Sequence, residues 1–219
     1  MRALVLLCSL LAVAGCASGM SKEECLYADW RAIGYEDGAA GRSATAVSSR
    51  RVACAEKAKV TPDMEAYLAG RDAGLDQFCR PANGFDLGSR GGRYFGACQG
   101  RDERAFVSAY EKGLTLHGLV SNYESASRAL ANAHADLDNI EHQITHTQAA
   151  IVNPATPNPA RIDHLAEMKT LYDRRDKVRD AIPALVRDVD IAEAELEDYR
   201  RDMAGHEFAG AVRATSASY

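Results

Sequence analysis

Aromatic side chains are scarce in this chain, which has a single tryptophan and an aromatic content of only 7%. An excess of basic residues is also missing, because 26 Lys and Arg stand against 31 Asp and Glu, for a formal net charge of −5. A nucleic-acid-binding domain normally presents a basic face, so we expect no nucleic-acid partner. The mean hydropathy of −0.28 excludes a protein that crosses a membrane many times. The 219 residues suffice for one or two domains.

Motifs typical of catalysis and metal binding are missing too. The chain has neither G-x-S-x-G nor H-E-x-x-H, and residues 25–102 contain no histidine. His142 and His146 are helical neighbours with Asp138 in the same line, but these three positions fall on the expected water-facing side of a coiled coil. We therefore expect no catalytic residue, no metal site and no cofactor.

Residues 1–15 have the features of an export signal. Arg2 precedes an apolar run, residues 3–13, that is too short to span a membrane. The next residues, Ala14-Gly15-Cys16, complete a pattern that resembles a bacterial lipobox, in which the cysteine is acylated and the signal is cut just before it. We expect Cys16 to carry the lipid, with palmitate among its acyl chains. The alternative is an ordinary secretory signal that is cut nearby.

The expected lipid determines where the protein is predicted to reside. Several acyl chains anchor a protein far more firmly than one chain does. By resemblance to sorted lipoproteins, Ala17 after the cysteine favours the outer membrane of a bacterial envelope, with the protein facing the periplasm. Residues 16–24 would form the lipidated tether.

Glycine and cysteine are concentrated in one part of the chain. Thirteen of the 17 glycines lie between residues 34 and 118, and none lies between residues 119 and 204. This contrast predicts a Gly/Cys-rich head over residues 25–102 and a separate helical part over residues 103–204. Residues 205–219 are expected to form a flexible tail. The predicted fold is mainly α.

Four cysteines of the head remain once the signal and the lipid site are set aside: Cys25, Cys54, Cys79 and Cys98. They are 29, 25 and 19 positions apart, whereas zinc sites usually use cysteine pairs two to four residues apart. In an oxidising compartment they favour two disulfides. Three pairings are possible, and we favour Cys25–Cys54 with Cys79–Cys98, because they close the shorter loops. Each would contribute about 3 kcal/mol in the loop-entropy model.

A short Y-x-x-G phrase recurs in the head and just beyond it, at Tyr35–Gly38, Tyr67–Gly70 and Tyr110–Gly113. Glycine inside a helix costs about 1 kcal/mol relative to alanine, so the repetition needs a reason. We favour close helix packing over a ligand slot, because aromatic residues at helical spacing usually belong to the core. The unequal spacing does not indicate a solenoid. The ligand alternative is a surface formed by Trp30, Tyr35, Asp37, Tyr67, Arg71 and Tyr94.

The segment between Cys79 and Cys98 contains Pro81 and five glycines. This composition predicts an irregular loop pinned by a disulfide. Its Arg90 and Arg93 could attract an anion, although the segment lacks a phosphate-loop motif.

Residues 103–204 carry two heptad seams with alternating spacings of three and four. The first seam comprises Tyr123, Ala126, Leu130, Ala133, Leu137, Ile140, Ile144, Thr147 and Ile151; the second comprises Met168, Leu171, Arg175, Val178, Ile182, Leu185, Val189, Ala192, Leu196, Tyr199 and Met203. A proline-rich turn over residues 152–160 separates them and predicts an antiparallel coiled-coil hairpin. Pro183 should kink the second arm or interrupt its hydrogen bonding.

The head resembles a family of small bacterial lipoproteins catalogued as domain of unknown function 2799. The residues that carry the likeness are Cys25, Asp29-Trp30, Gly34-Tyr35-Glu-Asp-Gly38, Cys54, Tyr67-Leu-Ala-Gly70-Arg71, Gly74-Leu75, Cys79, Asn83-Gly84, Gly88, Tyr94, Cys98 and Tyr110-x-x-Gly113. With the lipobox, the resemblance covers residues 1 to about 118. It implies an envelope lipoprotein and no particular chemistry.

These patterns favour a binding or scaffolding lipoprotein of the cell envelope without catalysis. Its partners would be the membrane, through Cys16, and an envelope protein or a second copy, through the hairpin of residues 103–204. One alternative is a module that binds cell-wall glycan through Trp30 and Tyr35. The other is a glycan hydrolase that uses Asp29, Glu36 and Asp37, because paired carboxylates can act as general acid and base.

Overall fold

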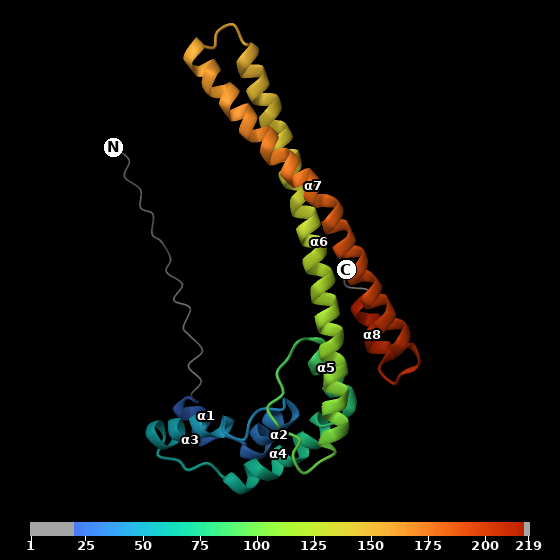
Figure 1. Ribbon diagram of the computed structural model, residues 1–219. Helices are drawn as coiled ribbons and strands as arrows, with labels where there is room; N and C mark the ends of the chain where they lie inside the picture. The colour runs from blue at the N-terminus through green and yellow to red at the C-terminus, as the bar shows by residue number, and fades with distance from the viewer. Residues whose placement is uncertain (1–19, 217–219) are drawn as a thin grey trace, which may run out of the picture. The chain divides into compact units, whose positions relative to one another are not determined.

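This computed structural model describes residues 20–216, in which all regular structure is helical (Figure 1). The helices are α1 (Lys22–Leu26), α2 (Trp30–Ala39), α3 (Ala46–Lys57), α4 (Met64–Phe78), α5 (Pro81–Ser89), α6 (Glu103–Val152), α7 (Asn158–Asp202), the 3₁₀ turn η1 (Met203–Gly205) and α8 (Ala209–Ser216). The chain divides into two compact units. Unit 1 comprises residues up to 80 together with 94–105, and unit 2 comprises residues 81–93 and 106 onward. The export signal, Cys16 and Ala17 lie outside the described residues.

Unit 1 is built on helices whose starts are set by side chains that cap the first turn. Ser21 and Glu24 form a reciprocal capping box at α1. Asp29 and Asp63 accept hydrogen bonds from the backbone of the first turn at the starts of α2 and α4. The core of the unit contains Cys25, Trp30, Val47, Cys54 and Tyr67. The two disulfides of the structure, Cys25–Cys54 and Cys79–Cys98, have the pairing favoured from the sequence.

Helices α2 and α4 cross with their backbones almost in contact, because glycines occupy the crossing. A Cβ atom on Gly34 would lie 2.0 Å from the carbonyl oxygen of Tyr67, and one on Gly70 would lie 1.9 Å from that of Arg31. Gly38 and Gly74 are equally close to the opposite backbone, at 2.2 Å each. No larger side chain fits at these positions, and the glycines of the Y-x-x-G phrase therefore serve packing.

Helices α5 and α6 form a second crossing that repeats the close contacts of Gly34, Gly38 and Gly74 at Gly84, Gly88 and Gly113. A Cβ atom on Gly84 would meet the carbonyl oxygen of Phe106 as one on Gly34 meets that of Tyr67. Gly88 likewise faces Tyr110 as Gly38 faces Arg71. Residues of α5 lie 50 positions after their counterparts in α2, and residues of α6 lie 39 positions after theirs in α4.

The C-terminal ends of α2 and α5, the first helix of each crossing, match as well. Gly41 and Gly91 follow α2 and α5 with φ of +63° and +67°, a left-handed conformation that favours glycine. The prediction of an irregular loop between Cys79 and Cys98 is wrong for Pro81–Ser89, which form α5. Small residues that read as a loop in isolation are the residues that allow α5 to pack closely against α6.

The predicted helical hairpin is present in unit 2 as α6 and α7, which run side by side near their connecting turn (Figure 1). All seam positions of both arms are buried or half-buried. Ile140, Ile144, Met168 and Leu171 form a buried cluster near the turn. The half-buried seam residue Arg175 pairs with Asp176 and lies over the Tyr172 ring, 4.8 Å from its centre.

The turn itself covers residues 153–157 and is held by polar contacts. Thr156 donates its hydroxyl to the carbonyl of Ala150 at 2.7 Å, and Arg161 donates to the carbonyls of Asn153 and Thr156 at 3.1 Å. Helix α7 continues through Pro183 as a single helix, and this proline is exposed.

Residues 205–219 are not simply a flexible tail, because they include α8. Phe208 and Val212 are buried in a cluster with Phe85, Leu116 and Leu196. The Phe208 ring stacks on that of Phe85 at 4.8 Å between centres. Phe208 and Val212 therefore complete the core of unit 2.

Candidate functional site

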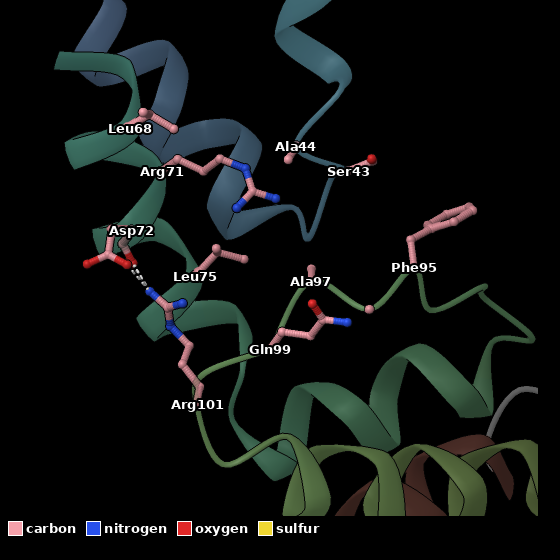
Figure 2. Close-up of a pocket in the computed structure, with 11 residues that line it drawn as sticks. Ser43, Ala44, Leu68, Arg71, Asp72, Leu75, Phe95, Ala97, Gln99 and Arg101 are labelled. Carbon is pink, nitrogen blue, oxygen red and sulfur yellow. Dashed lines mark hydrogen bonds and ion pairs between the residues drawn. The ribbon is translucent and has the colours of Figure 1, made fainter. Parts of the chain in front are cut away.

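A pocket of about 640 Å³ opens in unit 1 between α4 and the segment that follows Tyr94 (Figure 2). Its lining residues are Ser43, Ala44, Leu68, Arg71, Asp72, Leu75, Phe95, Gly96, Ala97, Gln99 and Arg101. Leu68, Leu75 and Phe95 make part of the lining apolar, and 56% of Leu68 and 61% of Phe95 are exposed to solvent. The pocket thus combines apolar surface with two guanidinium groups.

Beside this pocket lies a buried carboxylate, Asp37, which three donors hold in the ionised form. Arg42 donates to it at 2.8 Å, the Tyr67 hydroxyl donates at 2.9 Å, and Arg50 forms a bidentate pair with it. Burial favours the protonated acid, but the hydrogen bonds from Arg50, Tyr67 and Arg42 outweigh that effect and hold the pKa of Asp37 below its usual range. Burial and the bond to this carboxylate raise the pKa of Tyr67 to about 12.

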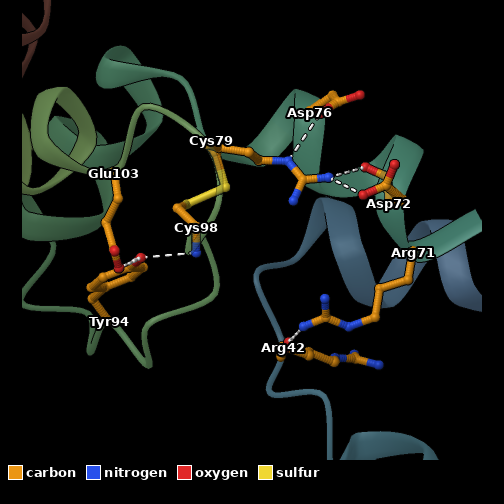
Figure 3. The surroundings of a disulfide bond; sticks show 9 residues. Arg42, Arg71, Asp72, Asp76, Cys79, Tyr94, Cys98 and Glu103 are labelled. Atoms are coloured by element: carbon orange, nitrogen blue, oxygen red, sulfur yellow. Dashed lines mark hydrogen bonds and ion pairs between the residues drawn. A yellow bond between two sulfur atoms is a disulfide. The ribbon is translucent and has the colours of Figure 1, made fainter. Parts of the chain in front are cut away.

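Arg71 extends from α4 into the pocket and is only 9% exposed. Its Nη2 donates to the backbone carbonyl of Arg42 at 2.6 Å (Figure 3). The buried Nε of Arg71 has no hydrogen-bond partner among the residues that the structure describes. None of the ion pairs in this part of the chain includes Arg71.

The second guanidinium of the pocket, that of Arg101, is already paired. It donates to the Asp72 carboxylate at 2.5 Å and to the Asp76 carboxylate at 2.9 Å. These pairs tie the segment after Cys98 to α4, in addition to the disulfide between Cys79 and Cys98 (Figure 3). The wall of the pocket opposite α4 is therefore held by one covalent bond and two ion pairs.

Tyr94 also stabilises this wall of the pocket through its hydrogen bonds. Its hydroxyl donates to the Glu103 carboxylate at 2.7 Å and accepts the backbone N–H of Cys98 at 2.9 Å (Figure 3). Burial and the bond to Glu103 raise the pKa of the Tyr94 hydroxyl to about 12, so it remains a donor at neutral pH.

The structure separates the six residues of the predicted ligand surface. Trp30, at 7% exposure, and Tyr67 belong to the core of unit 1, which is the packing role favoured from the sequence. Asp37 is fully buried, so these three residues form no outer surface. Tyr35 is 45% exposed and does not line the pocket, and Tyr94 acts through its hydrogen bonds. Only Arg71 lines the pocket.

Several pocket residues were not predicted from the sequence. Phe95 lies in the segment predicted to be an irregular loop between Cys79 and Cys98, and Gln99 and Arg101 follow directly after Cys98. Their only sequence signal is their position beside Cys98, which a disulfide brings to the end of α4.

Comparison with known proteins gives a match to one family model and no activity. Residues 29–115 match the model of the family described as "Protein of unknown function (DUF2799)", which confirms the resemblance of the head. Searches of curated proteins and of solved structures found no match. Among the described residues, no group of three or more His, Cys, Asp or Glu side chains could hold a metal ion. In the same part of the chain, no helix has the length and apolar character needed to cross a membrane.

Proposed function

We propose that this protein is a lipid-anchored lipoprotein of the bacterial outer membrane whose unit 1 binds a small ligand in the periplasm. The observation that carries the binding role is the pocket containing the buried and unpaired Arg71. A rigid pocket with some apolar lining and a few placed polar groups is the usual form of a ligand site. The N-terminal lipobox supports the anchor, and two disulfides suit an oxidising compartment.

The proposal is for binding without catalysis because the carboxylates near the pocket are engaged. Asp72 and Asp76 pair with Arg101, and Asp37 accepts four hydrogen bonds from three side chains while ionised. A general acid needs a raised pKa, and the pKa of Asp37 is lowered. The glycan-binding alternative relied on Trp30 and Tyr35 as sugar platforms, but the Trp30 indole is buried and the exposed Tyr35 does not line the pocket.

We further propose that the hairpin has the scaffolding role. Ile162, Leu165, Val186 and Ile191 leave large apolar side chains exposed on α7, where an envelope protein or a second copy could pack. Replacing Ile162 and Leu165 by lysine should reduce the mass of any assembly measured by light scattering. An unchanged monomer before and after the substitutions would leave the hairpin as a spacer.

The anchor is tested at Cys16. The wild-type chain should incorporate labelled palmitate and sediment with the outer membrane, whereas Cys16→Ser should do neither. Retention of the label by the Cys16→Ser variant would contradict the proposed lipid site.

The binding role is tested by native mass spectrometry of the protein isolated from the envelope. The wild-type chain should carry a small-molecule adduct that is lost in Ala44→Trp, which fills the pocket. Ala69→Trp adds the same ring at an exposed position of α4 outside the pocket and should retain the adduct. A wild-type spectrum without an adduct, or equal loss in both variants, would contradict the binding role.

A further inference from the structure

We propose that the pocket of unit 1 recognises a carboxylate joined to an apolar group, and that Arg71 is the residue that binds the carboxylate. This inference rests on the proposed binding function and specifies the chemistry of the ligand. It depends on three features of the described residues: an uncompensated buried cation, a second copy of the same helix crossing that lacks it, and the apolar lining around it.

The first feature is a local excess of positive charge. The Asp37 carboxylate pairs with Arg42 and Arg50, while Arg71 is joined to this cluster through the backbone carbonyl of Arg42. Arg71 is left with a hydrogen bond to a backbone carbonyl and with a buried Nε that has no partner among the described residues. A buried charge is costly unless it is paired. The guanidinium is a planar fork that matches a carboxylate with two parallel hydrogen bonds.

The second feature is the α5–α6 crossing, which shows that the fold does not need this cation. The counterpart of Arg71 is Tyr110, whose hydroxyl donates to the carbonyl of Gly92 at 2.9 Å. Arg71 makes the matching bond to the carbonyl of Arg42 at 2.6 Å. In the second crossing, a neutral side chain therefore makes the hydrogen bond that Arg71 makes in the first.

The rest of the polar cluster is also absent from the second crossing. The counterparts of Asp37 and Tyr67 are Leu87 and Phe106, and that of Arg42 is Gly92. The two crossings have matching close contacts with entirely different polarity at these positions. A helix crossing of this kind thus forms without a cation at the position of Arg71, and a ligand accounts for the cation in unit 1.

The third feature is the surface beside Arg71. Leu68 and Leu75 come from the same helix and Phe95 from the opposite wall, while Gln99 supplies an amide (Figure 2). Arg101 is satisfied by Asp72 and Asp76, so Arg71 is the cation with binding capacity to spare. A single carboxylate next to an apolar group fits this lining better than a strongly hydrated anion such as phosphate does. That chemistry is shared by the C-terminus of a peptide and by a fatty acid.

The experiment compares acids with their neutral amides on the soluble chain from residue 17 onward with both disulfides formed. The probes are N-acetyl-Ala-Phe and octanoate, each beside its amide, with inorganic phosphate as a further arm, and binding is followed by calorimetry. We expect the acid of at least one pair to bind at least tenfold more tightly than its amide and than phosphate. The pair that binds identifies the source as a peptide C-terminus or a fatty acid.

Two variants locate the carboxylate. Arg71→Tyr installs the residue of the second crossing, so it should abolish binding while the unfolding midpoint reported by Trp30 fluorescence is retained. Arg90→Gln removes the same charge at an exposed position outside unit 1 and should bind as the wild type does. Should Arg71→Tyr fail to fold, Leu68→Glu provides the test, because a carboxylate one helical turn from Arg71 should occupy it and weaken acid binding at least tenfold. Leu68→Gln is its neutral control and should bind normally.

The outcomes separate this inference from the function on which it rests. Equal binding of acids and amides, equal binding of phosphate, or equal losses in Arg71→Tyr and Arg90→Gln would overturn carboxylate recognition and leave a binding role intact. If no probe binds although the native adduct is present, the ligand belongs to another class and this inference is wrong. Absence of the adduct from the native mass spectrum of the wild-type chain would contradict the proposed function.

Discussion

Gly113 and Gly118 lie in the same helix, and the same substitution should change stability in opposite directions at the two sites. A Cβ atom on Gly113 would lie 2.2 Å from the carbonyl oxygen of Phe85 and 2.7 Å from the backbone nitrogen of Ser89. A Cβ atom on Gly118 would meet nothing within 4 Å. The helix and the chemical change are therefore the same at both sites. The difference is that Gly113 packs against α5 and Gly118 packs against nothing.

The magnitude follows from two opposing effects. Alanine gains about 1 kcal/mol over glycine inside a helix, and Gly118→Ala should raise the free energy of unfolding by about 0.5–1 kcal/mol. At Gly113 the contact must open from 2.2 Å to at least 3.0 Å, so α5 must retreat by about 0.8 Å. Backbone shifts forced by overpacking cost about 1–3 kcal/mol, and we expect Gly113→Ala to lower the free energy of unfolding by about 1–2 kcal/mol after the helix gain.

The assay is urea unfolding followed by far-ultraviolet circular dichroism, with hydrogen exchange of the α5 amides as a local measurement. Gly113→Ala should unfold at lower urea and exchange faster in α5, whereas Gly118→Ala should do neither. Equal stabilisation by both substitutions would refute the close crossing of α5 and α6.

Three further outcomes are expected. Gly70→Ala should lower the urea midpoint reported by Trp30 fluorescence, because its Cβ would lie 1.9 Å from a backbone oxygen, and an unchanged midpoint would contradict the α2–α4 crossing. Asp37→Asn should destabilise unit 1 by about 3–5 kcal/mol at pH 7. Because the folded pKa of Asp37 is below its ordinary 3.8, its contribution is present above about pH 4 and lost as pH falls through the folded pKa, so the difference from wild type should shrink in acid. Phe208→Ala should lower the thermal midpoint of unit 2 through the loss of about 3–5 kcal/mol of core packing, measured by circular dichroism; an unchanged midpoint would mean that Phe208, just before α8, does not contribute to the core.

Local patterns predicted the long helices and the disulfide pairing because their causes are local. Heptad spacing places one face of each arm in the seam, and a proline-rich turn must reverse the chain between them. Each cysteine also pairs with the next one along the chain, and each bridge encloses one short helix, α2 or α5. These features follow from short periodicities and from the order of the cysteines along the chain.

The repeated helix crossing could not be found from the Y-x-x-G phrase. In the second crossing Phe85 and Phe106 take the places of Tyr35 and Tyr67, and Ala109 takes the place of Gly70. The spacing differs between the first and second helices of each pair, so no single period exists. Close backbone contact requires small residues at the crossing itself but places no requirement on the identity of the neighbouring side chains.

The sequence by itself determined a helical protein with an export signal pattern, a glycine-rich head and a coiled-coil hairpin, because these follow from composition and short periodicities. Only the tertiary structure decided that glycines form two equivalent crossings, that α8 closes the core of unit 2, and that Arg71 is buried beside a pocket without a carboxylate partner. Burial and pairing depend on residues that are distant along the chain. The sequence gives the charge of a side chain, but only the fold determines whether an oppositely charged group lies close enough to pair with it.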